Sequence, residues 1–284
     1  GRIEQVHGGV SRNVVEDIAN VELRPTFVSL VDESGIGRDV VENLKRHKVN
    51  TDYIRVTPDG MGTWLAVFDN QGDVVASISR RPDLLPILDI LKEHGDEIFG
   101  SCDSIVVEFD INREILKEIF FYAEKYQKAV YAVISNMTIA IKRRDYLKKI
   151  DCVVCNQQEA GILFMEDYAA LNPEEMAETL GQKILQAEIP RAVVTMGEHG
   201  AAYASENGEK GVVPAHKVHV TDTTGAGDSF FAGVAIGLTY GKTLREACEI
   251  GTRIAASVIC TMESVCPRFM PGEFGLDVEV KCHL

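Results

Sequence analysis

Short apolar runs rich in β-branched residues alternate with helical segments along this chain, and that alternation limits the fold more than any other feature. Five runs have the length and composition of buried parallel strands, namely residues 26–31, 104–109, 129–134, 151–155 and 191–196. Helical stretches lie between them, for example at 37–47, 113–126 and 173–187. Strand, helix and strand in series predict right-handed βαβ units, and hence an α/β fold with a doubly wound, mostly parallel sheet flanked by helices.

Two other regions predict a small antiparallel sheet. Residues 1–7 and 62–79 alternate apolar and polar side chains, and the second region turns at 69–72, so strands are expected at about 1–9 and 60–80. A small sheet beside a large α/β layer is expected to form a lid over a cleft. The alternative is a hairpin that covers the edge of the main sheet. No linker or repeat divides the chain, so residues 1–284 are interpreted as a single domain.

The charge balance limits the partners. The formal net charge is −14, from 29 basic and 43 acidic side chains, and it disfavours broad nucleic-acid binding because phosphates would be repelled. No run approaches the roughly 18 consecutive apolar residues of a membrane span, and the chain does not open on a basic segment followed by an apolar one. We therefore expect a small-molecule partner, with neither nucleic acid nor membrane.

The seven cysteines are scattered and odd in number, which indicates a reducing cytoplasm rather than a disulfide framework. Cys152 and Cys155 have the spacing of a zinc knuckle. No second pair follows, however, and the segment has the pattern of a buried strand, so a structural role is preferred to a zinc site.

The run 220–233 carries the chemistry. The small residues Gly225, Ala226 and Gly227 permit a tight turn with outward N–H groups, and a helix is expected to start at Asp228. Such a turn before a helix N-terminus is an anion site, because free N–H groups and the helix dipole both favour negative charge. The carboxylate of Asp228 at its mouth would accept a proton from a hydroxyl that attacks a phosphate. The alternative is that Asp228 only caps the helix.

Residues 222–230 (DTTGAGDSF) closely resemble the C-terminal signature of the ribokinase-like PfkB kinases. Three other segments are similar to motifs of that family: 8–13 (GGVSRN) to its N-terminal di-glycine signature, 156–159 (NQQE) to its NxxE motif, and 195–200 (TMGEHG) to its nucleotide-loop TxGxxG. Together they span nearly the whole chain, which lacks the GxGxxG and Walker motifs of other nucleotide-binding folds. The chain is therefore identified as a member of this family.

The resemblance implies an ATP-dependent kinase that phosphorylates an alcohol group of a sugar or nucleoside. In the family, the residue that matches Asp228 is the base that activates the acceptor hydroxyl. The backbone N–H groups of Gly225, Ala226 and Gly227 would form the anion hole for the transferred phosphoryl group.

The resemblance also implies a nucleotide side of the site. Asn156 and Glu159 match the motif that organises Mg²⁺ and its waters beside the ATP phosphates, and a hard divalent ion held largely through water suits one amide and one carboxylate. Asn156, Thr195, Gly197 and Gly200 would lie along the nucleotide, where glycines allow close approach of the backbone.

A monovalent cation is a further implication. Asp222 and Thr224 match positions that bind such an ion, usually potassium, in many members of the family. The complementary loop falls near 260–267 and lacks the glycine and the terminal serine of ribokinase itself. Dependence on potassium is therefore left open.

Substrate residues are expected from the di-glycine segment, the lid and the end of the strand at 104–109. They are Gly8, Gly9, Asn13, Thr63, Glu108 and Asp110. The glycines permit close approach to a polyol, and the amide and the carboxylates offer hydrogen bonds to hydroxyl groups. Trp64 would either cover the substrate or form part of the core of the lid.

Within the family, segments 1–13 and 62–79 look most like pseudouridine kinases, so pseudouridine is the preferred acceptor. Two features depart from the pattern: family members often have an Asp-Pro pair where this chain has 135–136, and the family's opening strand has no counterpart in the sequence given, so we expect its residues to precede Gly1. Kinases of ribose, a ketohexose or another nucleoside are alternatives, and so is a non-catalytic ligand-binding regulator of the same fold. The intact Asp228 and its glycines argue against the regulator. A homodimer through strand pairing at the lid edge is expected.

Overall fold

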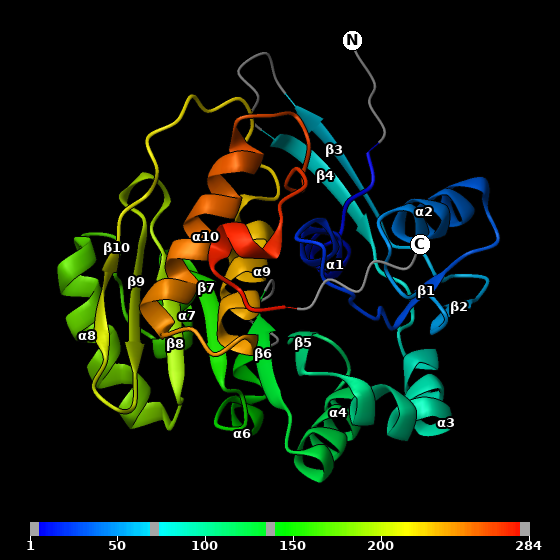
Figure 1. Cartoon of the computed structure of the whole chain (residues 1–284), viewed down its shortest axis with the longest axis horizontal. Helices are drawn as coiled ribbons and strands as arrows, with labels where there is room; N and C mark the ends of the chain where they lie inside the picture. Colours follow the sequence, from blue (N-terminus) through cyan, green and yellow to red (C-terminus); the bar gives the residue numbers. More distant parts are fainter. Residues whose placement is uncertain (1–5, 69–73, 135–139, 279–284) are drawn as a thin grey trace.

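The computed structural model describes residues 6–68, 74–134 and 140–278. Its centre is a six-stranded sheet in the order β10-β9-β8-β7-β6-β5 (Figure 1). Four strands are parallel: β5 (Ser104–Glu108), β6 (Ala129–Val133), β7 (Cys152–Asn156) and β8 (Arg191–Thr195). Two antiparallel strands, β9 (Ala201–Ser205) and β10 (Lys210–Val213), extend the sheet beyond β8.

Helices cover both faces of this sheet (Figure 1). One face packs against α1 (Val10–Asn20), α9 (Ala226–Thr239) and α10 (Leu244–Ile259). The other packs against α3 (Pro86–Ser101), α4 (Arg113–Tyr126), α6 (Arg144–Leu147), α7 (Gln157–Phe164) and α8 (Pro173–Ala187). The predicted doubly wound sheet is confirmed, and two of the predicted helices, α4 and α8, have the expected bounds.

Burial on both faces explains why the strands are apolar throughout. In β7, Val153 and Cys155 belong to the core beneath α3, α4 and α8, whereas Cys152 and Val154 belong to the core beneath α9. The two cysteines therefore point to opposite faces of the sheet. They therefore cannot bind one metal ion together, which agrees with the interpretation of this segment as a buried strand.

One predicted strand does not belong to the main sheet. The run at 26–31 forms only a short strand, β1 (Ser29–Val31), which pairs in parallel with β2 (Ile54–Val56) in a separate two-stranded sheet. Between them lies α2 (Gly35–Arg46), which starts earlier than predicted because the Ser34 side chain accepts a hydrogen bond from the Gly37 N–H (3.1 Å). Composition indicates a buried strand, but it does not specify the neighbour with which that strand pairs.

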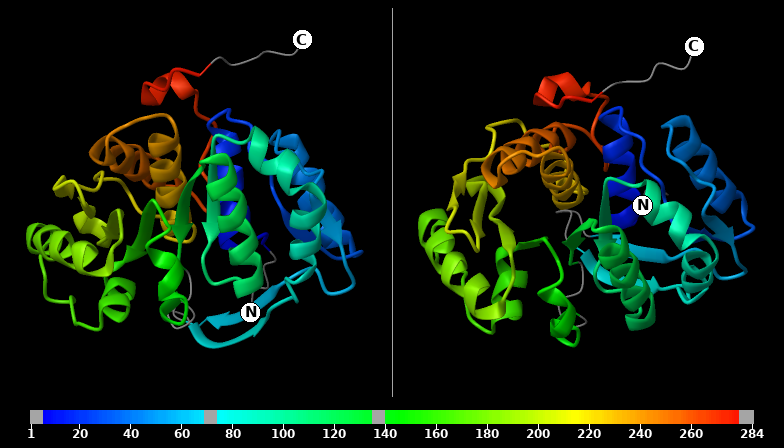
Figure 2. Two further views of the ribbon diagram at one scale, coloured as in Figure 1. Left: turned by 90° about the horizontal axis from the view of Figure 1, so that it is seen from below. Right: turned by 60° about the horizontal axis from the view of Figure 1, so that its bottom comes forward.

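The lid consists of β3 (Thr63–Phe68) and β4 (Val74–Arg80), which pair antiparallel and lie apart from the six-stranded sheet (Figure 1 and Figure 2). The predicted lid strand at 1–9 is described only from residue 6, and residues 6–9 have no strand structure. The predicted turn at 69–72 lies outside the described residues, as do residues 135–136. Short 3-10 turns, Gly197–His199 and Pro271–Phe274, complete the described elements, and none of the described helices is long and apolar enough to cross a bilayer.

Candidate active site

Asp228 lies in the first turn of α9, and its carboxylate faces α1. The helix begins after Gly225, which has a left-handed backbone (φ 82°), and no side chain caps it. Asp228 therefore does not cap the helix, which was the alternative to a base. Its Oδ2 atom accepts a hydrogen bond from Asn13 Nδ2 (2.7 Å) across 215 residues of sequence. The N-terminal di-glycine segment thus reaches the motif near the other end of the chain.

The electrostatic surroundings of Asp228 suit a proton acceptor. Burial raises the pKa of Asp228 from 3.8 to about 6, the hydrogen bond from Asn13 and the charge of Arg12 oppose this rise, and the nearby carboxylate of Glu108 adds to it. A carboxylate with a pKa just below neutral is ionised at physiological pH, and it is still basic enough to take a proton in a transition state.

The predicted anion hole is only partly available. The Ala226 N–H donates to the carbonyl of Thr223 (3.2 Å), so the turn already uses it. Within the described residues, the N–H groups of Gly225 and Gly227 make no hydrogen bond. They lie at the N-terminus of α9, where unpaired donors and the helix dipole favour an anion. Two of the three predicted donors therefore remain for a phosphoryl group.

The loop at 260–267 closes against this turn. A Cβ atom on Gly225 would lie 2.1 Å from the carbonyl oxygen of Ser264, so only glycine allows the loop to approach this closely. By contrast, a Cβ atom on Gly227 would meet no atom of residues 6–68, 74–134 and 140–278 within 4 Å. The open space at the helix start therefore lies beside Gly227.

The di-glycine segment lies beside the end of β5. Gly9 (φ 103°) precedes α1, and Ser11 Oγ donates to Glu108 Oε2 (2.8 Å). A Cβ atom on Gly8 would meet no described atom within 4 Å, so the part of the chain that the structure describes leaves this backbone open to a ligand. The structure thus brings Gly8, Gly9, Asn13 and Glu108 together, but it gives Asn13 a contact with the base that the sequence did not predict.

Two arginines near Asp110 were also missed. Arg81, directly after β4, forms an ion pair with Asp110 Oδ2 (3.4 Å), and Arg143 donates to the carbonyl of Phe109 (3.1 Å). They connect the lid and the segment before α6 to the end of β5. The signal in the sequence was local, since residues 80–81 and 142–144 are short basic clusters in an acidic chain.

Asn156 and Glu159 form a capping box at the start of α7. Asn156 Oδ1 accepts from the Glu159 N–H (2.8 Å), and Glu159 Oε2 accepts from the Asn156 N–H (2.8 Å). This use of one oxygen leaves the second oxygen of Glu159 for another ligand. Burial raises the pKa of Glu159, and the nearby charge of Asp110 adds to the rise. A hydrated divalent cation would favour the ionised form of Glu159, so its second carboxylate oxygen fits a role beside Mg²⁺ through water.

The residues of the predicted nucleotide loop have different surroundings. Thr195 ends β8 directly beside Asn156 at the end of β7, at the carboxyl edge of the parallel strands. A Cβ atom on Gly200 (φ 91°) would lie 2.1 Å from the Val213 carbonyl oxygen, whereas one on Gly197 would meet none of the described residues within 4 Å. Gly200 is therefore required by packing against β10, and only Gly197 borders open space.

The remaining predicted residues are the two potassium ligands and two residues of the lid. Asp222 Oδ1 accepts from the N–H (2.9 Å) and hydroxyl (2.8 Å) of Thr224, so the two predicted potassium ligands bind each other. Thr63 is exposed at the start of β3. Trp64 is 60% exposed, so it does not form a core of the lid.

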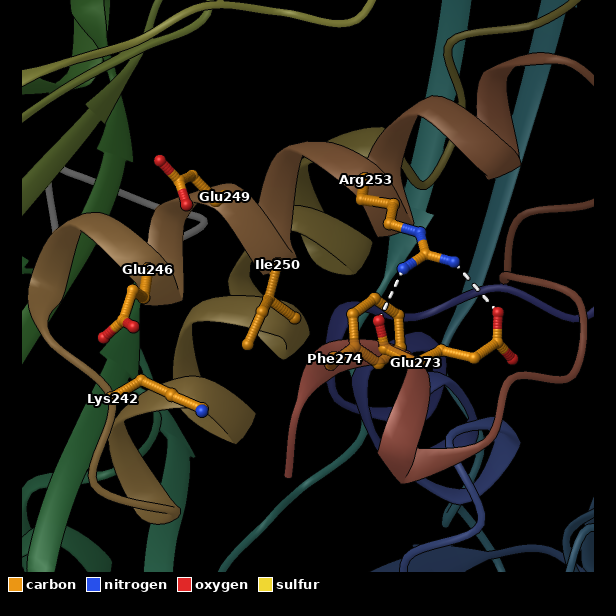
Figure 3. A pocket seen from close by; sticks show the side chains of 7 residues that line it. All are labelled: Lys242, Glu246, Glu249, Ile250, Arg253, Glu273 and Phe274. Carbon is orange, nitrogen blue, oxygen red and sulfur yellow. Dashed lines mark hydrogen bonds and ion pairs between the residues drawn. The ribbon is translucent and has the colours of Figure 1, made fainter. Parts of the chain in front are cut away.

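A separate open pocket of about 260 Å³ lies between α10 and the C-terminal 3-10 turn (Figure 3). Its lining residues are Lys242, Glu246, Glu249, Ile250, Arg253, Glu273 and Phe274. Its arginine, Arg253, is already paired with Glu273 (2.9 Å), and Lys242 donates to the Gly275 carbonyl (2.8 Å). The pocket contains none of the predicted site residues, and its basic groups are satisfied within the protein, so we prefer the site at Asp228.

Known proteins share both the sequence and the fold. The family described as pfkB family carbohydrate kinase matches residues 1–267. The guanosine-inosine kinase of Exiguobacterium acetylicum is 32% identical over 266 residues, which cover 93% of this chain and 87% of that protein. The pseudouridine kinase of Escherichia coli (strain K12) is 27% identical over 253 residues, or 87% of this chain and 79% of that protein.

Among solved structures, Arabidopsis thaliana ribokinase complexed with ribose and ATP has a TM-score of 0.80 and 19% identity, with 95% of this chain and 88% of that chain covered. This likeness supports the ribokinase fold, and the sequence matches support the family. The chain therefore belongs to the pfkB family of carbohydrate kinases and is an ATP-dependent kinase of sugars or nucleosides.

Proposed function

We propose that the protein transfers the γ-phosphoryl group of ATP to a hydroxymethyl group of a nucleoside, with Asp228 as the base. One observation carries the proposal: the Asp228 carboxylate lies in the same helical turn as the N–H group of Gly227, which no described residue accepts and beside which an added Cβ atom would meet no described atom. Phosphoryl transfer depends mainly on positioning and on charge stabilisation, and this arrangement supplies both at one place.

The reaction follows from this arrangement. The nucleoside hydroxyl transfers its proton to Asp228 as its oxygen bonds to the γ-phosphorus. The bond between that phosphorus and the β–γ bridging oxygen breaks, and ADP leaves. The N–H groups of Gly225 and Gly227 would donate to the phosphoryl oxygens, where negative charge is concentrated. Glu159 would hold, through water, the Mg²⁺ ion that neutralises charge on the phosphates. Turnover is therefore expected to require added Mg²⁺, which an assay with and without the ion checks.

Guanosine and inosine are the first acceptors to test, because the relative at 32% identity over 93% of the chain is a guanosine-inosine kinase. Pseudouridine is the second candidate, favoured by the likeness of the di-glycine and lid segments and by the relative at 27% identity. A panel of guanosine, inosine, adenosine, pseudouridine and ribose, compared by kcat/KM, separates these acceptors. Equal turnover of ribose and the nucleosides would contradict the nucleoside proposal. If these compounds bind but none is phosphorylated, the result would favour a non-catalytic ligand-binding regulator of the same fold.

The base is tested by Asp228→Asn, which keeps the shape of the side chain and removes its basicity. We expect kcat to fall by roughly 10²–10⁴, while ATP binding measured by calorimetry is retained. Asp167→Asn is the matched control, since this exposed aspartate lies in a turn outside the site and an amide oxygen can still accept from Ala169 N. Wild-type turnover in Asp228→Asn would remove the base from the mechanism.

We also infer that two copies pair through the lid. Leu65 and Ile78 lie directly opposite each other on one face of the hairpin, and they are 60% and 70% exposed. Val67 on the same face is 53% exposed. Adjacent apolar side chains of this size are usually covered by a partner.

A further inference from the structure

Arg12 is buried beside the base, and the mechanism above gives it no role. Its residue is only 9% exposed, although arginine is rarely buried unless it is paired. The guanidinium donates to the carbonyls of His7 (2.7 Å) and Gly8 (3.3 Å), to Ser264 Oγ (3.1 Å), to the carboxylate of Glu16 and to Oδ1 of Asn13. It thus connects the di-glycine segment, α1 and the loop at 260–267.

These contacts determine which way the amide of Asn13 points. An asparagine side chain has a donor end and an acceptor end, whereas a guanidinium only donates. Asn13 must therefore turn its oxygen toward Arg12, and the hydroxyl of Ser264 donates to the same oxygen (3.3 Å). The NH₂ group is left facing the carboxylate of Asp228 (2.7 Å). The opposite orientation would place donors against donors and oxygen against oxygen.

We propose that Arg12 is a positioning residue that holds the amide of Asn13 in the orientation that donates to Asp228. The proposal rests on the proposed role of Asp228 as the base. Through this bond Arg12 fixes the direction of the carboxylate, and therefore the oxygen that receives the proton. The structure also shows why the role belongs to arginine, because only a fork of several donors reaches Asn13, Glu16 and two carbonyl groups together.

The positioning role of Arg12 can be measured through the pKa of Asp228, which depends on the charged and titratable groups that face this carboxylate. They are Arg12 and Asp17 from α1 and Glu108 from β5. The hydrogen bond from Asn13 and the charge of Arg12 both favour the ionised form of Asp228. Loss of either is expected to move the acidic limb of the pH profile of kcat/KM to higher pH, since the base must be ionised to act.

Arg12→Lys and Arg12→Met separate orientation from charge. Lysine keeps the positive charge but cannot make the same set of contacts, and methionine removes both. We expect both variants to move the acidic limb upward, by about one pH unit for Arg12→Met, which corresponds to a roughly tenfold lower kcat/KM on the acidic side. Because Arg12→Met leaves the Glu16 carboxylate buried, Arg12→Met/Glu16→Gln is measured beside it, with melting temperatures for all variants.

The decisive comparison uses Asn13→Ala as a background. If Arg12 acts through Asn13, then Arg12→Lys moves the limb in the wild-type background and leaves it unmoved in the Asn13→Ala background. An equal movement in both backgrounds would overturn the proposal, because the effect would then be direct. So would unchanged limbs with lowered melting temperatures, which would mark Arg12 as a structural residue only.

Two further measurements keep this proposal distinct from the one it rests on. An acidic limb that disappears in Asp17→Asn would belong to Asp17 and would overturn the assignment of the limb. An inactive Asp228→Asn together with unmoved limbs in the Arg12 variants would remove the positioning role alone. An active Asp228→Asn would remove the base itself.

Discussion

Gly225→Ala tests whether the closure of the C-terminal loop on the anion-hole turn stabilises the protein. Gly225 has φ 82°, and an added Cβ atom would lie 2.1 Å from the carbonyl oxygen and 2.7 Å from the carbonyl carbon of Ser264. Those atoms belong to the backbone, so they cannot move aside as the end of a flexible side chain would. Either the turn changes its conformation or the loop moves away.

The expected cost follows from these two strains. A left-handed backbone costs an alanine about 1–2 kcal/mol, and overpacking of this kind typically costs about 1–3 kcal/mol. The stiffer unfolded chain returns about 0.4–1 kcal/mol. The free energy of unfolding should therefore fall by roughly 2–4 kcal/mol, which lowers the melting temperature by about 4–8 °C for a chain of this length.

Gly227→Ala is the matched control two residues away. Its Cβ atom would meet nothing within 4 Å in the described part of the chain, and its helical position favours alanine over glycine. Its melting temperature should therefore equal or exceed that of the wild type. Its methyl group would enter the space proposed for the phosphoryl group, and turnover should fall by roughly ten- to a hundredfold. Thermal denaturation and ATP turnover are measured for both variants. A melting temperature of Gly225→Ala within about 1 °C of the wild type would refute the packing argument.

The remaining predictions concern a buried carboxylate and the lid. Burial raises the pKa of Asp17 from 3.8 to about 7, so its contribution to stability is fully present below pH 3.8 and is lost as the pH rises through 7. Asp17→Asn can keep the contacts with Cys266 N (2.6 Å) and Ser229 Oγ (2.7 Å). Between pH 5 and pH 8, its free energy of unfolding in urea should therefore fall by about 2 kcal/mol less than that of the wild type. An equal fall in both proteins would contradict this. For the lid, light scattering at micromolar concentration should show a dimer for the wild type and a monomer for Ile78→Lys, which places a charge opposite Leu65. A monomeric wild type would end that proposal.

Local spacing was sufficient for much of the molecule. The helices α4 and α8 and the strands β5 to β8 follow from apolar periodicity, because burial on one or both faces imposes a repeat on the sequence itself. The base and the glycine turn are neighbours in the chain, so their proximity at the start of α9 needed no tertiary information. The capping box of Asn156 and Glu159 is equally local, and the Asn-x-x-Glu spacing indicates it. From the sequence, these residues were interpreted only through the family motif.

Contacts between distant segments were decided only by the tertiary structure. Arg12 meets Ser264 across 252 residues, and Asn13 meets Asp228 across 215. The pairing of β1 with β2 belongs to the same class. A sequence states which side chains are able to donate, accept or pack, since that is the chemistry of each residue. Which of them meet depends on how the helices and loops pack, and the orientation of the base is fixed at that level.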